Sequence, residues 1–160
     1  MASPAPSPSH FALRPGGVED LDEVMLVMGQ AFRPCFGEGW TRSQCAGILP
    51  MSGVSLMIAE DGQGIVGFSL ARGVADEAEL LLIAIHPERQ GRGAGNLLLQ
   101  QFISAARNGG ARRMHLEVRD GNPAVGLYRR SGFVPAGRRR NYYKGPDGER
   151  YDAVTLMLVD

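Results

Sequence analysis

The chain has few cysteines and no long apolar run. Among its 160 residues only Cys35 and Cys45 are cysteines, which excludes a disulfide scaffold and favours two reduced thiols. No stretch approaches the roughly 20 apolar residues of a bilayer-spanning helix, so we expect no membrane partner and a cytoplasmic location. The three histidines, His10, His86 and His115, have no metal-ligand spacing, so we expect no metal site.

The first ten residues, MASPAPSPSH, offer little that could be buried. They also lack the basic start and the apolar centre of a secretory signal. Proline, serine and alanine in this pattern predict a flexible tail over residues 1–10. The remaining length suits one compact domain, residues 11–160.

The net charge is zero, but the charges are unevenly distributed. Residues 1–80 hold four basic and ten acidic side chains, whereas residues 81–160 hold thirteen basic and seven acidic ones. The second half therefore suits an anionic ligand, or else presents a solvated basic face. A total charge of zero argues against nucleic acid as a partner.

Apolar spacing predicts an α+β domain with helices on both sides of one mixed sheet. A stripe from Val18 to Phe32 predicts a first helix, and Thr41 to Gln44 form a capping box for a second. Asn122 followed by Pro123 predicts the start of a late, short helix. The other predicted elements are strands at 11–14, 54–60, 65–74, 78–85, 114–118, 133–143 and 151–158, and a helix from residue 94.

A glycine-rich loop joins the predicted strand 78–85 to the helix that follows. In Gln90-Gly91-Arg92-Gly93-Ala94-Gly95 the glycines leave backbone N–H groups accessible at a helix N-terminus, where they and the helix dipole can bind a pyrophosphate. Arg89 and Arg92 add positive charge. Asn96-Leu97 replaces the Lys-Ser/Thr pair of a P-loop, and the alternating glycines after a hairpin argue against a dinucleotide fingerprint.

The run ELLLIAIHPERQGRGAG over residues 79–95 resembles the acetyl-CoA motif of the GNAT superfamily, Q/R-x-x-G-x-G/A after an apolar strand. Downstream, LEVR at 116–119, Leu127-Tyr128, Gly132-Phe133 and RNYY at 140–143 are similar to the bacterial ribosomal-protein-alanine N-acetyltransferases (RimI type). The resemblance covers residues 11–159. It implies the GNAT fold, a mixed sheet of about seven strands flanked by about four helices, and an enzyme that transfers an acetyl group from acetyl-CoA to a primary amine.

The same resemblance implies the cofactor-binding residues. The strand before the glycine loop is expected to supply backbone N–H groups for the oxyanion, at Ile83, Ala84 and Ile85. Asn122 matches a cofactor-binding asparagine of the family. The loop positions expected to bind the pyrophosphate are Gln90, Gly91, Arg92, Gly93, Ala94, Gly95 and Asn96.

Acetyl transfer to an amine needs a base for the amine proton and benefits from an acid for the thiolate. The resemblance assigns these roles to Glu117 and Tyr128, with Glu79 as the second choice of base. From the residues alone, Glu117 is equally well an ion-pair partner of Arg119 or Arg113, and Tyr128 a core aromatic. The spacing from Asn122 to Tyr128 is one residue shorter than the family's N-x-x-A-x-x-L-Y, which would rotate a helix by about 100°.

The acceptor amine is implied by shorter segments. Tyr142 and Tyr143 resemble the hairpin that holds the acceptor in protein N-terminal acetyltransferases, and Trp40 lies where the family forms the opposite wall. The predicted partner is a protein N-terminus such as that of a ribosomal protein. A small amine acceptor such as an aminoglycoside or polyamine, and a non-catalytic acyl-CoA-binding domain, remain alternatives. Oligomeric state is unknown from the sequence.

Overall fold

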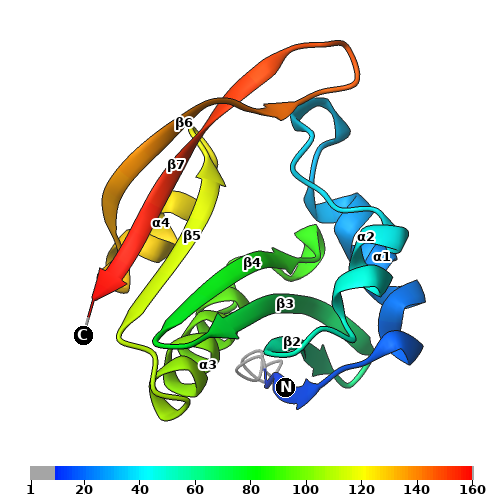
Figure 1. Ribbon diagram of the computed structural model, residues 1–160. Coiled ribbons are helices and arrows are strands. Elements are labelled where there is room, and N and C mark those ends of the chain that lie inside the picture. Colours follow the sequence, from blue (N-terminus) through cyan, green and yellow to red (C-terminus); the bar gives the residue numbers. More distant parts are fainter. Residues whose placement is uncertain (1–9, 160) are drawn as a thin grey trace, which may run out of the picture.

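The computed structural model describes residues 10–159, so the predicted tail lies almost wholly outside the described residues. This part of the chain forms seven strands and four α-helices (Figure 1). Their bounds are β1 Ala12–Pro15, α1 Leu21–Ala31, α2 Arg42–Ile48, β2 Val54–Asp61, β3 Gly64–Val74, β4 Glu77–Ile85, α3 Ala94–Asn108, β5 Arg113–Arg119, α4 Ala124–Arg130, β6 Val134–Lys144 and β7 Arg150–Val159.

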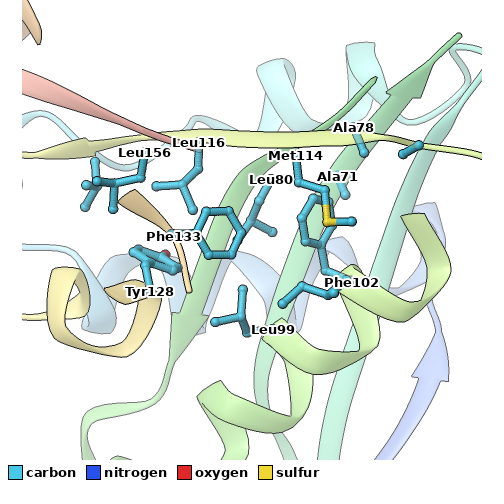
Figure 2. Packing of buried hydrophobic residues seen from close by; sticks show 13 residues of the cluster. Ala71, Ala78, Leu80, Leu99, Phe102, Met114, Leu116, Tyr128, Phe133 and Leu156 are labelled. Atoms are coloured by element: carbon cyan, nitrogen blue, oxygen red, sulfur yellow. The ribbon is translucent and has the colours of Figure 1, made fainter. Parts of the chain in front are cut away.

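The strands form one mixed sheet in the order β1-β2-β3-β4-β5-β7-β6. Only β4 and β5 run parallel, and α3 makes the crossover between them. Helices α1 and α2 pack on one face through a cluster around Val24, Met28 and Phe68, while α3 and α4 pack on the other. Figure 2 shows the second cluster, in which Tyr128 and Phe133 lie against Leu99 beneath β5. The predicted fold class is confirmed.

The first helix begins later than the apolar stripe predicts. Val18 is 58% exposed in a 3-10 turn, and α1 starts only at Leu21. The reason is local, because the Asp20 carboxylate accepts the Gly17 N–H at 3.0 Å and is held by Arg14 at 2.9 Å. The capping box at Thr41 and Gln44 is confirmed.

The two parallel strands separate along their length. Strand β4 pairs with β5 only from Glu77 to Leu80, and beyond that point the strands diverge (Figure 1). The register between β3 and β4 shifts at the same place, since Leu70 lies opposite Leu82 and Ala71 opposite Leu80. Leu81 is therefore an extra residue in β4, and both Leu81 and Leu82 pack toward α1 and α2. The sheet opens at its centre.

The long β6–β7 hairpin arches from the sheet toward the loop of residues 33–40, between α1 and α2 (Figure 1). The backbones meet closely, because a Cβ added to Gly37 would lie 2.1 Å from the Lys144 carbonyl oxygen, and one added to Gly145 would lie 2.0 Å from that of Cys35. This contact bounds the open end of the sheet on the side away from α3.

Candidate active site

A groove of about 1060 Å³ follows the gap between β4 and β5. The glycine loop lies at one end of its lining and the 33–40 loop at the other. Of the predicted site residues, the lining includes Ile83, Ala84, Ile85, Gln90, Gly91, Gly93, Ala94, Gly95, Asn96, Glu117, Asn122, Tyr128 and Tyr143. It does not include Arg92, Glu79, Trp40 or Tyr142.

The open edge of β4 presents backbone donors to the groove. The N–H of His86 donates to the Val66 carbonyl of β3 at 2.7 Å. Since hydrogen bonding alternates along an antiparallel pair, Ala84 also faces β3, whereas the N–H groups of Ile83 and Ile85 point the other way, into the gap. Two of the three predicted oxyanion positions thus have the required direction.

The glycine loop places the N-terminus of α3 at the other end of the groove. Gly91 and Gly93 have φ angles of 78° and 92°, in the left-handed region that favours glycine. The side chain of Gln90 donates to the Ile85 carbonyl at 3.1 Å, which fastens the loop to β4. In α3 the first intrahelical bond joins the Leu97 N–H to Gly93, so the preceding N–H groups have no intrahelical acceptor.

The two arginines of this loop differ in position. Arg89 pairs with Asp61 at 3.1 Å and donates to Gln63 at 2.7 Å, so its guanidinium ties the loop to the β2–β3 turn. Arg92 is exposed. The backbone donors of the loop and the helix dipole are the features that can bind an anion here without either guanidinium.

Tyr128 reaches the groove from α4 and is only 5% exposed. Its ring packs edge-on against Phe133 with centroids 6.1 Å apart. Burial, together with the nearby Tyr143 and Glu38, raises the pKa of Tyr128 well above its usual value. The phenol therefore stays protonated at any physiological pH and can act only as a proton donor.

Glu117 and Glu79 occupy different surroundings. The Glu117 side chain accepts from the Thr155 hydroxyl at 2.8 Å and pairs with Arg139 at 3.0 Å, at the edge of the groove. Glu79 lies where β4 and β5 are still paired, with His115 at 3.4 Å and Arg72 at 3.8 Å. Glu117 does form an ion pair, but with Arg139 of β6 and not with Arg119 or Arg113, which pair with Glu38 and Glu77.

The predicted acceptor residues are spread over the hairpin and the α2 start. The Tyr143 hydroxyl donates to the Glu117 carbonyl at 3.3 Å, and Tyr142 is 49% exposed with its ring edge-on to Tyr143. Asn141, which precedes the two tyrosines, has φ 54°, and its N–H donates to Asp152. Trp40 packs instead against the core beneath α1 and α2.

Glu38 also lines the groove, although it was not predicted as a site residue. It is 8% exposed and pairs with Arg119 at 2.8 Å. It also accepts from the Asn122 amide at 2.6 Å. Its partners lie 81 and 84 positions away, so no local pattern could have indicated them.

Within residues 10–159, no group of three or more His, Cys, Asp or Glu side chains is arranged to hold a metal ion. Across the same residues, no helix has both the length and the apolar character needed to span a bilayer.

Comparison with known proteins identifies the family. Residues 22–133 match the acetyltransferase (GNAT) family. The chain is 42% identical over 103 residues, 64% of its length and 70% of the relative's, to the ribosomal protein bS18-alanine N-acetyltransferase of Haemophilus influenzae. It is 34% identical over 151 residues, 92% and 95% of the two lengths, to the putative bS18-alanine N-acetyltransferase of Bacillus subtilis.

A solved structure agrees in fold. The crystal structure of the ribosomal-protein-S18-alanine N-acetyltransferase from Escherichia coli superposes with a TM-score of 0.82, at 29% identity and covering 94% of both chains. The predicted acetyl-CoA-dependent N-acetyltransferase activity, which this family performs, is thereby confirmed. The chain belongs to the acetyltransferase (GNAT) family and is similar to its ribosomal-protein-alanine N-acetyltransferases.

Proposed function

We propose that the chain acetylates the α-amine at the N-terminus of a protein, and that ribosomal protein bS18 beginning with alanine is the acceptor. The observation that carries this proposal is the bounded acceptor end of the groove, where the 33–40 loop meets the β6–β7 hairpin at Gly37 and Lys144. Such an end suits an extended chain terminus. The names of the relatives supply the candidate acceptor.

The groove suits the shape and charge of acetyl-CoA. The N–H groups of Ala94, Gly95 and Asn96 at the start of α3 suit a pyrophosphate. The gap where β4 leaves β5 suits the pantetheine arm. The N–H groups of Ile83 and Ile85 would then donate to the thioester oxygen, where negative charge develops during attack.

The side chains supply the proton transfers. Glu117 accepts a proton from the acceptor ammonium, directly or through one water, so that the neutral nitrogen can attack the thioester carbon. The carbonyl π electrons move to the oxygen held by the β4 N–H groups. The C=O bond then re-forms as the C–S bond breaks, and the departing thiolate takes the phenolic proton of Tyr128. The extra proton on the new amide nitrogen passes to the Tyr128 phenolate, directly or through water, which restores the phenol, and Glu117 releases its proton to solvent.

Glu117 is preferred to Glu79 as the base because of position. Glu117 borders the groove on the same strand as Arg119, beyond the point where β4 and β5 separate. Glu79 lies before that point and outside the groove lining, engaged by His115 and Arg72. A carboxylate must lie within hydrogen-bond reach of the proton that it removes, or one water away.

The test is acetyl-CoA turnover on a matched set of acceptors. A peptide with the N-terminal sequence of bS18 should be acetylated, whereas the same peptide carrying an N-terminal formyl group and an internal lysine should not. Mass spectrometry locates the new acetyl group. Faster turnover of an aminoglycoside or polyamine would replace the protein acceptor with a small amine, and tight CoA binding without any turnover would contradict catalysis altogether.

A further inference from the structure

Glu38 is a buried carboxylate inside the groove. At 8% exposure it is as buried as Asp20, and these two are the only acidic side chains in the buried class among residues 10–159. Asp20 forms its ion pair with Arg14 away from the groove. Glu38, in contrast, enters the groove from the 33–40 loop, close enough to Tyr128 and Tyr143 to raise the pKa of both phenols.

The two oxygens of Glu38 hold two different elements. Oε1 accepts from Nε of Arg119, the last residue of β5, at 2.8 Å. Oε2 accepts from Nδ2 of Asn122, which precedes α4, at 2.6 Å. One carboxylate from the α1–α2 loop therefore joins the end of β5 to the start of α4.

The same loop also holds Arg119 by a second contact. The guanidinium carbon lies 3.7 Å from the centroid of the Phe36 ring, within cation–π range. Phe36 in turn packs edge-on against Tyr151 of β7 at 5.1 Å. The side chains of Arg119 and Glu38 are 11% and 7% exposed, so water and salt screen their attraction little.

Asn122 connects the Glu38 carboxylate to the first turn of α4. With Nδ2 engaged by Glu38, its Oδ1 faces the helix and accepts the Ala124 N–H at 2.8 Å. Ala124 and Tyr128 are four residues apart, so they lie on one face of successive turns. The orientation of the first turn of α4 thereby determines where the Tyr128 hydroxyl lies.

We propose that Glu38 is a positioning residue, which fixes the start of α4 through Asn122 and Arg119 and so places Tyr128 in the groove. The inference rests on the proposed role of Tyr128 as the acid. Glu38 itself neither donates nor accepts a proton in the transfer.

An exchange of partners tests the inference. In Glu38→Gln the side chain keeps one acceptor oxygen for two donors, so either Arg119 or the Asn122 amide loses its partner. In Asn122→Asp two carboxylates oppose each other. In the double variant the new amide at position 38 can donate to the new carboxylate at position 122, which still accepts the Ala124 N–H, while the amide oxygen at position 38 accepts from Arg119.

We expect each single variant to lower kcat about tenfold or more, because a misplacement of about 1 Å is enough to do so. The double variant should recover to within about threefold of wild type, since the two effects are coupled. The KM for acetyl-CoA should stay near the wild-type value in Glu38→Gln. Multiplying losses in the double variant, or a fully active Glu38→Gln enzyme, would overturn the inference.

Two controls separate positioning from other roles. Asp20→Asn removes the ion pair of the other buried carboxylate and should lower Tm while leaving kcat unchanged. An equal loss of kcat there would mean that Glu38 matters only for stability. The pH profile of kcat should keep its shape in Glu38→Gln. Loss of its acidic limb would make Glu38 the base and overturn the assignment.

A readout without an acceptor keeps this test independent of the proposed function. The chain has four tyrosines, so the ring signals of ¹³C-labelled tyrosine can be assigned with Tyr128→Phe. The Tyr128 signal should shift in Glu38→Gln and return in the double variant. An unmoved signal would overturn the inference, whereas absence of peptide acetylation by the wild-type enzyme would count against the proposed function alone.

Discussion

The contact between the 33–40 loop and the β6–β7 hairpin can be tested with three glycines. A Cβ at Gly37 would lie 2.1 Å from the Lys144 carbonyl oxygen, and a Cβ at Gly145 would lie 2.0 Å from that of Cys35. Cβ atoms essentially never come within 3.0 Å of a heavy atom outside their own residue and its two chain neighbours. Either alanine variant must therefore push the loop and the hairpin apart by roughly 1 Å, because the contacts are close-packed.

The three positions separate backbone strain from steric overlap. Gly37 has φ 68° and Gly148, in the turn of the same hairpin, has φ 88°, but a Cβ at Gly148 would meet nothing within 4 Å. Alanine in this region of φ costs about 1–2 kcal/mol. With about 2–4 °C of Tm per kcal/mol, Gly148→Ala should lower Tm by about 2–8 °C. Gly145→Ala introduces only the steric overlap. Gly37→Ala introduces both the overlap and the backbone strain, so it should be the least stable of the three variants.

Activity should follow the overlap rather than the strain. We expect kcat/KM for the bS18 peptide to fall about tenfold to a hundredfold in Gly145→Ala and Gly37→Ala, because a 1 Å displacement of a substrate-positioning wall can cost that much. Gly148→Ala should keep the wild-type kcat/KM despite its lower Tm, and the KM for acetyl-CoA should change in none of them. A Gly145→Ala enzyme with wild-type kcat/KM would refute the reasoning.

Four further variants test the site and the hairpin. Tyr128→Phe should lower kcat by about 10²-fold or more while acetyl-CoA still binds, and a fully active variant would exclude Tyr128 as the acid. Because burial raises the pKa of this phenol, the wild-type rate should show no loss at alkaline pH from its deprotonation. In steady-state kinetics, Glu117→Gln should lower kcat by about 10²-fold or more, whereas Glu79→Gln should leave kcat near the wild-type value. The reverse result would make Glu79 the base. Asp152 accepts the Asn141 N–H and pairs with Arg138, which together hold the pKa of its carboxyl below the usual value. The contribution of Asp152 to stability is thus present above the unfolded pKa of about 3.9 and disappears as the pH falls through the folded pKa. Asp152→Asn should therefore lower the free energy of unfolding, measured by urea titration, more at pH 6 than at pH 3. Equal losses at both pH values would contradict this prediction.

Much of the fold could be predicted because local signals agree with the tertiary structure. The turn at residues 61–64, the capping box at Thr41 and the glycine loop each specify a boundary through backbone chemistry that needs no distant partner. Val18 shows the limit of such reasoning. Its spacing fits the helical stripe, but the ion pair of Asp20 with Arg14 starts the helix three residues later.

The opening of the sheet could not be read from the apolar pattern. Residues 80–85 are all apolar, so no alternation marks which side chain faces which helix layer. The bulge at Leu81 changes which side chains of β4 face which helix layer, although the residues on either side of it are equally apolar. It also turns the N–H groups of Ile83 and Ile85 toward the gap. The resemblance implied donors at this strand, whereas their direction follows only from the register.

The short spacing before Tyr128 illustrates why the remaining part of the site needs three dimensions. Counted along the helix, one missing residue would turn the tyrosine by about 100°, yet Tyr128 is buried against Phe133 and borders the groove. Asn122, which precedes this helix, is held by Glu38 of the 33–40 loop. A contact across 84 positions has no local signature, so no sequence pattern could have indicated Glu38 as the residue that we infer positions α4.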